Sequence, residues 1–182
     1  MRKVRYSVAM SLDGYIAGAG GEYDWIPHEP DIDWVGFMAR FDTMLVGRKT
    51  YEVAQAQGGG PSTGMRTFVF SRTLRSEEHP DVTVVAEDAA GVVAGLRAEE
   101  GKEIWLMGGG VLAASLLDAG LVDAIEVGLV PVLLGGGLPF LPGLSRRVRL
   151  ALRERQEYPT SGIVRLSYDV AADAPKRRRR SR

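Results

Sequence analysis

The chain has 182 residues, of which 45% are hydrophobic and 25% are charged, as is typical of one globular domain with a substantial core. It contains no cysteine, which excludes disulfides, thiolate nucleophiles and cysteine-ligated zinc or iron–sulfur clusters. We find no signal peptide and no apolar run of membrane-spanning length, so we expect a cytoplasmic protein.

The formal net charge is zero, but the charges are unevenly distributed. Residues 176–182 carry six positive charges, and the rest of the chain has 17 basic and 23 acidic residues. We therefore expect residues 1–172 to form the domain and residues 173–182 to form a disordered basic tail. Because the domain is acidic and no aromatic residue separates the arginines, we expect neither nucleic acid nor a membrane as a partner.

Strand and helix patterns alternate over the first two thirds of the chain. In chain order we expect a strand at 4–10, a helix at 32–41, a strand at 44–46, a helix at 49–57, strands at 67–70 and 82–85, a helix capped by Asp88 and running to about 100, a strand at 104–107, and a helix from 111 to about 117. This alternation predicts an α/β fold with a largely parallel sheet covered on both faces. The segment 18–30 is a long loop, and such loops are often functional.

The last third of the chain has a different pattern. An apolar strand is expected at 124–132, and it leads into a glycine-rich loop at 133–137 that we interpret as structural. Two strand patterns at 150–158 and 163–170 flank the turn residues 159–162. Because no helix separates these two strands, they predict an antiparallel hairpin at the edge of the sheet.

Two strand-to-helix junctions contain glycine. The first is Gly47–Thr50 and the second is Gly108–Gly110, and each follows an apolar strand pattern. A junction of this kind leaves N–H groups free at a helix N-terminus, where the helix dipole favours an anion. Two such junctions in one small domain suggest a ligand with more than one phosphate, such as a dinucleotide.

Four segments in the expected order resemble the dihydrofolate reductase-like family, and most of all the reductase domain of the bifunctional riboflavin-biosynthesis deaminase/reductase. They are residues 10–17, 46–52, 107–113, and 120–124 taken together with 131–137. The resemblance implies NADPH as cofactor and reduction of a small heterocyclic or ribosylaminopyrimidine substrate. A pterin reductase and an NADP-binding protein without catalysis are the alternatives. It also implies a homodimer, which the apolar segment 124–134 suits.

The same resemblance implies where the cofactor binds. Arg48 offers a guanidinium to the 2′-phosphate of NADP, Thr50 offers a hydroxyl and an N–H group to the pyrophosphate, and Ser71 with Arg72 follow a strand end that meets the 2′-phosphate. The alternative interpretation involves no ligand: Arg48 is then a surface arginine at the start of a helix, and Ser71 with Arg72 is a polar strand end. The implied cofactor-binding residues are Ala9, Ile16, Gly47, Arg48, Lys49, Thr50, Ser71, Arg72, Gly108, Gly109, Gly110, Val111 and Leu112.

The glycines at 108–110 allow the cofactor to approach the backbone without obstruction by a Cβ atom, although close packing of strand and helix would also require them. In the family the first Gly–Gly bond, here Gly108–Gly109, is often cis. Val111 stands where dihydrofolate reductase often has an arginine, which puts one phosphate contact in question.

The resemblance places a catalytic carboxylate after the first long loop, where Asp31 and Asp33 are the candidates. Either could donate a proton to a C=N group, but Asp31 could instead cap the following helix. If the reaction reduces an open-chain ribosyl group, water could supply the proton and no acid is needed. Asp13, before Gly14, is interpreted as a turn former. The spacing of His28 and His79 predicts no metal site.

Overall fold

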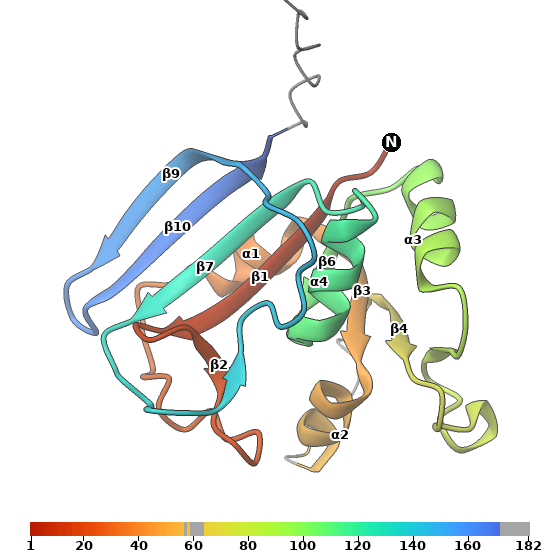
Figure 1. Cartoon of the computed structure of the whole chain (residues 1–182), viewed down its shortest axis with the longest axis horizontal. Coiled ribbons are helices and arrows are strands. Elements are labelled where there is room, and N and C mark those ends of the chain that lie inside the picture. Colours follow the sequence, from red (N-terminus) through yellow and green to blue (C-terminus); the bar gives the residue numbers. More distant parts are fainter. Residues whose placement is uncertain (57, 59–63, 172–182) are drawn as a thin grey trace, which may run out of the picture.

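The computed structural model of the chain describes residues 1–56, 58 and 64–171; the tail expected at 173–182 lies outside these residues. Most strands form one sheet, and they are β1 (Val4–Ser11), β3 (Phe41–Gly47), β4 (Arg66–Phe70), β5 (Thr83–Val85), β6 (Glu103–Met107), β7 (Ala124–Val130), β9 (Leu150–Tyr158) and β10 (Ile163–Val170). Their order across the sheet is β5-β4-β3-β6-β1-β7-β10-β9 (Figure 1).

The strand directions match the α/β fold expected from the sequence. β1 is parallel to β6 and β7, β3 is parallel to β4 and β6, and β4 is parallel to β5. β10 pairs antiparallel with both β7 and β9, so the predicted C-terminal hairpin forms one edge of the sheet. Parallel strands end at the same edge, and the residues after β1, β3, β4, β5, β6 and β7 are therefore brought together there.

Helices cover both faces of the sheet, as predicted. They are α1 (Trp34–Ala39), α2 (Arg48–Ala56), α3 (Ala89–Ala98) and α4 (Gly110–Asp118), and a 3-10 turn, η1, spans Ser76–Glu78. α3 and α4 bury Val93, Leu96 and Leu116 against one face, while α1 places Phe37 against Trp105 on the opposite face (Figure 1). Among the described residues, no helix is long and apolar enough to cross a membrane.

Local sequence signals account for several helix ends. Asp88 caps α3, as expected, because its carboxylate accepts a hydrogen bond of 2.9 Å from the N–H group of Gly91. Gly120 follows α4 with a φ of +71°, a conformation that glycine adopts without steric cost.

Two parts of the fold differ from the sequence prediction. Phe41 begins β3 and does not end the preceding helix, because it lies in the sheet beside Glu103 of β6. A small ribbon of β2 (Tyr15–Ala17) and β8 (Leu138–Pro139) was not expected, since neither segment is long enough to show a strand pattern.

The apolar segment after residue 124 is explained by its position inside the chain. β7 lies between β1 and β10, and most of its residues are buried. Its hydrophobic character therefore follows from packing within the domain and gives no argument for a dimer interface. The homodimer expected from the resemblance stays a prediction.

The sheet face beside α1 carries a cluster of paired charges. Glu126 of β7 is only 4% exposed. Its carboxylate lies 3.2 Å from Nη2 of Arg40, 3.7 Å from Nη1 of Arg5 and 3.8 Å from Nη1 of Arg165. Arg5 also pairs with Glu103 at 2.8 Å. Ionised groups at this depth require such partners, because an unpaired buried charge strongly destabilises the folded state.

Candidate functional site

The two glycine junctions meet at the edge of the sheet where the parallel strands end. Gly47 ends β3 and Gly108 follows β6, and these two strands are neighbours. After β3 the chain continues to β4 and β5 on one side of β3, and after β6 it continues to β7 on the other side. The connections that follow β3 and β6 therefore lead in opposite directions across the sheet. In open α/β sheets, ligands bind at such a point, beyond the carboxyl ends of the strands.

The backbones of the two junctions are in direct contact. A Cβ atom on Gly109 would lie 3.4 Å from the backbone nitrogen of Gly47, and one on Gly108 would lie 2.8 Å from Cγ2 of Thr50. Gly108 and Gly109 have φ angles of +59° and +66°, which side chains other than glycine rarely adopt. Close approach and backbone conformation therefore both require glycine at 108, whereas at 109 the backbone conformation alone requires it.

Gly110, the third glycine of the run, serves packing. A Cβ atom there would lie 2.6 Å from the carbonyl oxygen of Phe140 and 2.7 Å from that of Pro139. The two interpretations of the glycine run thus apply to different residues: Gly110 allows close packing, and Gly108 and Gly109 leave the backbone open to a ligand. The expected cis bond between Gly108 and Gly109 is not observed, because the described residues contain no cis peptide bond and the two positive φ angles turn the chain instead.

The N-terminus of α4 faces this edge of the sheet without a capping side chain. Gly109 is the N-cap residue, so it offers no side-chain acceptor to the N–H groups of the first turn. Val111 in that turn is 71% exposed, whereas Leu112 packs against the main core. Of the two residues expected to contact a ligand here, only Val111 has an accessible side chain.

The cations of the first junction are available at the surface. Arg48 is half-exposed and forms an ion pair with Glu52, with Nη1 at 2.8 Å from Oε1. Lys49 is exposed, and Thr50 lies beneath Gly108. An exposed ion pair one helical turn apart is weak, so Arg48 can exchange Glu52 for another anion at little cost.

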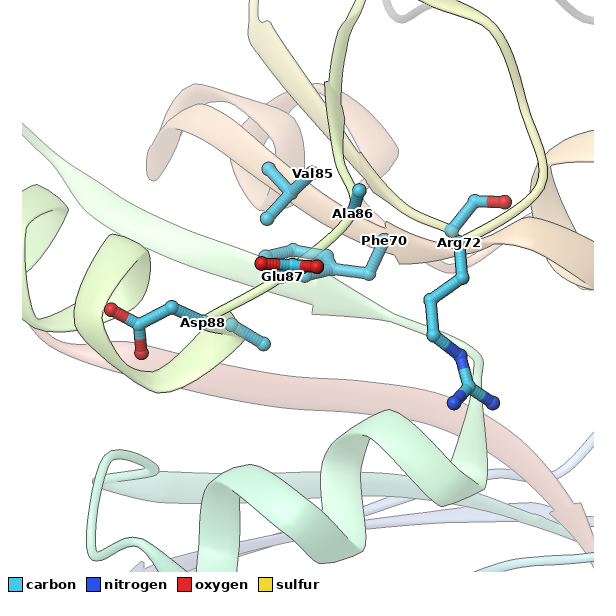
Figure 2. A pocket seen from close by; sticks show the side chains of 8 residues that line it. Phe70, Arg72, Val85, Ala86, Glu87 and Asp88 are labelled. Carbon is cyan, nitrogen blue, oxygen red and sulfur yellow. The ribbon is translucent and has the colours of Figure 1, made fainter.

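Ser71 and Arg72 line a pocket of about 290 Å³ at the ends of β4 and β5. The Ser71 hydroxyl is buried and accepts hydrogen bonds from the N–H groups of Thr73 and Leu74 at 3.1 and 3.0 Å. Its role is therefore to shape the turn. The Arg72 side chain is exposed and extends away from Glu87 and Asp88 (Figure 2). Arg72 is thus the cation of this pocket that remains accessible to a ligand.

Ala9 and Ile16 lie on the other side of the site. Ala9 of β1 is paired with Gly128 of β7, and Ile16 belongs to β2. Asp13, in the turn between β1 and β2, accepts hydrogen bonds from the Ser11 hydroxyl at 2.6 Å and from the Gly135 N–H group at 2.8 Å. These hydrogen bonds lower the pKa of Asp13 and keep it ionised. Asp13 therefore fixes the turn, as interpreted, and also ties it to the loop after β7, which the sequence did not indicate.

Asp31 and Asp33 do not occupy the position expected of a proton donor. Both side chains are exposed, and Asp33 caps α1 by accepting a 2.8 Å hydrogen bond from the Gly36 N–H group. The helix cap is therefore Asp33 and not Asp31, since α1 begins at Trp34. The structure gives no support for a partly dry carboxylate at either position.

The buried carboxylate of this loop is Glu29, which the sequence analysis missed. It is 2% exposed and accepts hydrogen bonds of 3.1 Å from the N–H groups of Asp31 and Ser161. Hydrogen bonds from Ser161 and from the Asp31 backbone lower the pKa of Glu29. Glu29 thereby fastens the first long loop to the β9–β10 turn, and no local signal could reveal a partner 132 positions away.

Replacing Glu29 by glutamine should make folding stability less dependent on pH. The folded-state pKa of Glu29 lies below its unfolded value, so its carboxylate stabilises the fold above the unfolded pKa and loses this effect as pH falls through the folded pKa. Urea unfolding should show Glu29→Gln to be less stable than the original chain at neutral pH, with a difference that shrinks between about pH 5 and about pH 3. A difference in unfolding free energy that stays constant over this pH range would show that the charge of Glu29 does not stabilise the fold.

The histidines show no arrangement suited to a metal. Nδ1 of His79 lies 3.1 Å from the Tyr51 hydroxyl, which is a structural contact. Within the described part of the chain, no group of three or more His, Cys, Asp or Glu side chains could hold a metal ion.

Comparison with known proteins identifies the family. Residues 2–164 match the family model of the RibD C-terminal domain. The chain is 30% identical over 179 residues to the uncharacterised protein YyaP of Bacillus subtilis, covering 92% of this chain and 94% of that protein.

Solved structures agree with this match. A candidate riboflavin biosynthesis protein from Shewanella sp. PV-4 is similar with a TM-score of 0.80 and 25% identity, over 93% of this chain and 99% of that one. A diaminohydroxyphosphoribosylaminopyrimidine deaminase/5-amino-6-(5-phosphoribosylamino)uracil reductase from Thermotoga maritima is similar in fold, with a TM-score of 0.68 and 18% identity, over 93% of this chain but 57% of that one. The chain belongs to the RibD C-terminal domain family.

Proposed function

We propose that the protein is an NADPH-dependent reductase of a small heterocyclic or ribosylaminopyrimidine compound. The family is that of the riboflavin-pathway reductase domains, which supports a reductase-like role. The cofactor and the substrate are our proposal. A pterin reductase of the dihydrofolate reductase type and an NADP-binding protein without catalysis are the alternatives.

The contact between the two glycine junctions is the observation that carries the proposal. Gly47 and Gly109 bring two backbones together at the ends of β3 and β6, and a Cβ atom on Gly108 would fill the space above Thr50. The uncapped N-terminus of α4 adjoins this contact, and the pocket with Arg72 lies at the ends of β4 and β5. Free N–H groups and a separate accessible guanidinium suit a ligand with a pyrophosphate and a further phosphate.

Each part of the site has a distinct task in this proposal. The N–H groups at the start of α4 and the Thr50 hydroxyl bind the pyrophosphate, and Arg72 binds the 2′-phosphate. Ala9 and Ile16 line the position of the nicotinamide. When bound, the cofactor supplies the hydride, and the protein orients it toward the substrate. We assign no side chain as proton donor, because Asp31 and Asp33 are exposed, and reduction of an open-chain ribosyl group can take its proton from water.

A titration with NADPH and NADH, followed by turnover assays, tests the proposal. We expect NADPH to bind more tightly than NADH, and a pyrimidine substrate to be reduced faster than a pterin. Equal affinity for both cofactors would refute the 2′-phosphate site. Tight NADPH binding without turnover of either substrate class would favour the non-catalytic alternative, and preferential turnover of dihydrofolate would favour the pterin reductase.

Replacing Arg72 by alanine should lower NADPH affinity by about tenfold or more and leave NADH affinity nearly unchanged, because a hydrogen bond to a charged group contributes about 1.5–3 kcal/mol. Isothermal titration of both cofactors measures this difference. Arg75→Ala is the matched control, since Arg75 lies three positions further on and its side chain is 78% exposed. An equal loss of affinity for NADPH and NADH in Arg72→Ala would show that Arg72 does not recognise the 2′-phosphate.

A further inference from the structure

One half of the candidate site is surrounded by segments that contain no lysine or arginine. These segments are residues 6–39, 124–145 and 156–164, which hold β2, α1, β7, β8, the β9–β10 turn and the part of β1 that follows Arg5. The first of them instead contains six carboxylates, namely Asp13, Glu22, Asp24, Glu29, Asp31 and Asp33. We call this half the substrate side, because the proposed function places the nicotinamide beside Ala9 and Ile16.

Specific contacts bring the three segments together in space. Asp13 binds the N–H group of Gly135 at 2.8 Å, and Glu29 binds that of Ser161 at 3.1 Å. Trp25 in the first long loop and Ile32 just after it pack with a cluster of three residues at the ends of β7, β9 and β10. These residues are Val130, Tyr158 and Ile163. The loops and turns of these segments lie on the same side of the sheet as the end of β1 (Figure 1).

Both anchoring carboxylates are negatively charged at neutral pH. Their hydrogen bonds lower the pKa of Asp13 and of Glu29, so neither carboxylate becomes neutral when the loops pack. The segments that enclose the substrate side therefore contribute a negative potential.

The arginines around Glu126, on the sheet face that carries Ala9, are already paired with carboxylates. Arg165 of β10 is paired in register with Gly128 and lies on the same face of the sheet as Ala9. Its guanidinium is 3.0 Å from Glu154 and 3.8 Å from Glu126. Arg5 and Arg40 belong to the same cluster of paired charges around Glu126. The accessible cations of the site, Arg48, Lys49 and Arg72, lie on the cofactor side, at the junction after β3 and at the end of β4.

α1, the helix of these segments, does not offer a backbone alternative to a cation. α1 is only six residues long, and the Asp33 carboxylate already accepts a hydrogen bond from its first turn. Exposed apolar side chains are present instead: Leu12 is 60% exposed after β1, and Leu133 is 69% exposed in the loop after β7. A phosphate dianion requires a guanidinium, an ammonium group or free N–H groups, whereas a neutral ring can pack on such leucines.

We infer that the substrate carries no phosphate, and that the substrate side takes a neutral or cationic ring compound. The inference rests on the proposed function and narrows it: of the ribosylaminopyrimidines, it selects the unphosphorylated form. The inferred substrate therefore differs from the one named for the Thermotoga maritima relative, because that compound carries a phosphoribosyl group.

The test compares two ligands that differ only in the phosphate. The full chain, saturated with NADP⁺, is titrated with 5-amino-6-(ribosylamino)uracil and with its 5′-phosphate. We expect the unphosphorylated form to bind at least about tenfold more tightly, because the phosphate loses its hydration without gaining a charged partner. Equal or tighter binding of the 5′-phosphate overturns the inference. Failure of NADP⁺ and NADPH to bind at all refutes the proposed function instead, so the two failures are distinguishable.

A gain-of-function variant decides the question even where the original chain binds neither form. Leu133→Arg supplies the missing cation and should tighten binding of the 5′-phosphate by about tenfold, with no such gain for the unphosphorylated form. Leu152→Arg is the matched control, because Leu152 is also exposed but lies on the edge strand β9. No gain in Leu133→Arg overturns the inference. If the original chain prefers the 5′-phosphate and loses this preference on deletion of residues 173–182, the basic tail supplies the cation and the inference is overturned as well.

Discussion

Replacing Gly108 by valine is expected to abolish NADPH binding and to lower the free energy of unfolding. The Cβ atom alone would lie 2.8 Å from Cγ2 of Thr50, and the branched side chain would occupy the space above the first junction. The φ angle of +59° adds a conformational cost of about 1–2 kcal/mol for any residue with a Cβ atom. Overpacking typically adds about 1–3 kcal/mol. Titration calorimetry and urea unfolding measure the two effects separately.

A double-mutant cycle keeps this prediction testable if the valine variant does not fold. Gly108→Ala introduces the Cβ atom only, and Thr50→Ala removes both Thr50 atoms that lie within 3 Å of it. We expect Thr50→Ala to recover the overpacking part of the destabilisation and to leave the backbone part unchanged. Gly95→Ala is the control, because a Cβ atom there meets nothing within 4 Å, and in helix α3 it should stabilise the fold by about 0.5–1 kcal/mol. A folded Gly108→Val variant with unchanged NADPH affinity would show that this glycine serves packing alone.

The strand and helix pattern was predictable because most elements are governed by local periodicity. The hairpin at 150–158 and 163–170 was placed to the residue, since alternating strands flank a short turn segment. The α/β class followed from the alternation of elements, and the two glycine junctions were visible in the sequence. The hairpin and each glycine junction are signalled within about 20 consecutive residues, and the α/β class requires only the order of such local signals along the chain.

The contacts that complete the site were not predictable, because they join distant parts of the chain. The contact of Gly47 with Gly109 and the hydrogen bond of Glu29 to Ser161 both depend on the order of the strands in the sheet. Reasoning from the sequence therefore selected the exposed Asp31 and Asp33 and overlooked Glu29. It also read the apolar segment 124–134 as suiting a homodimer, although the central position of β7 in the sheet accounts for the composition of that strand.

Replacing Glu126 by alanine is expected to destabilise the fold by about 3–5 kcal/mol, the usual effect of removing one partner from a buried ion pair. Its side chain is 6% exposed, and its carboxylate is shared by Arg5, Arg40 and Arg165. Without it, Arg5 and Arg40 keep only Glu103 as an ionic partner in this cluster. Urea unfolding at neutral pH measures the change. Glu126→Gln, which keeps the shape and loses the charge, should lie between the original chain and Glu126→Ala.

Glu154 provides the control for the Glu126 prediction, because it pairs with the same Arg165 at 3.0 Å but is 61% exposed. Glu154→Ala should cost no more than about 1 kcal/mol, since water screens an exposed ion pair. Where Glu126→Ala remains folded, NADPH affinity should be unchanged, because Glu126 is buried among its arginine partners and is not one of the residues proposed to contact the cofactor. A loss below about 1 kcal/mol in Glu126→Ala would mean that the arginines are hydrated and free to bind other anions. That result would also remove one support for a phosphate-free substrate, since Arg165 could then accept a phosphate beside Gly128.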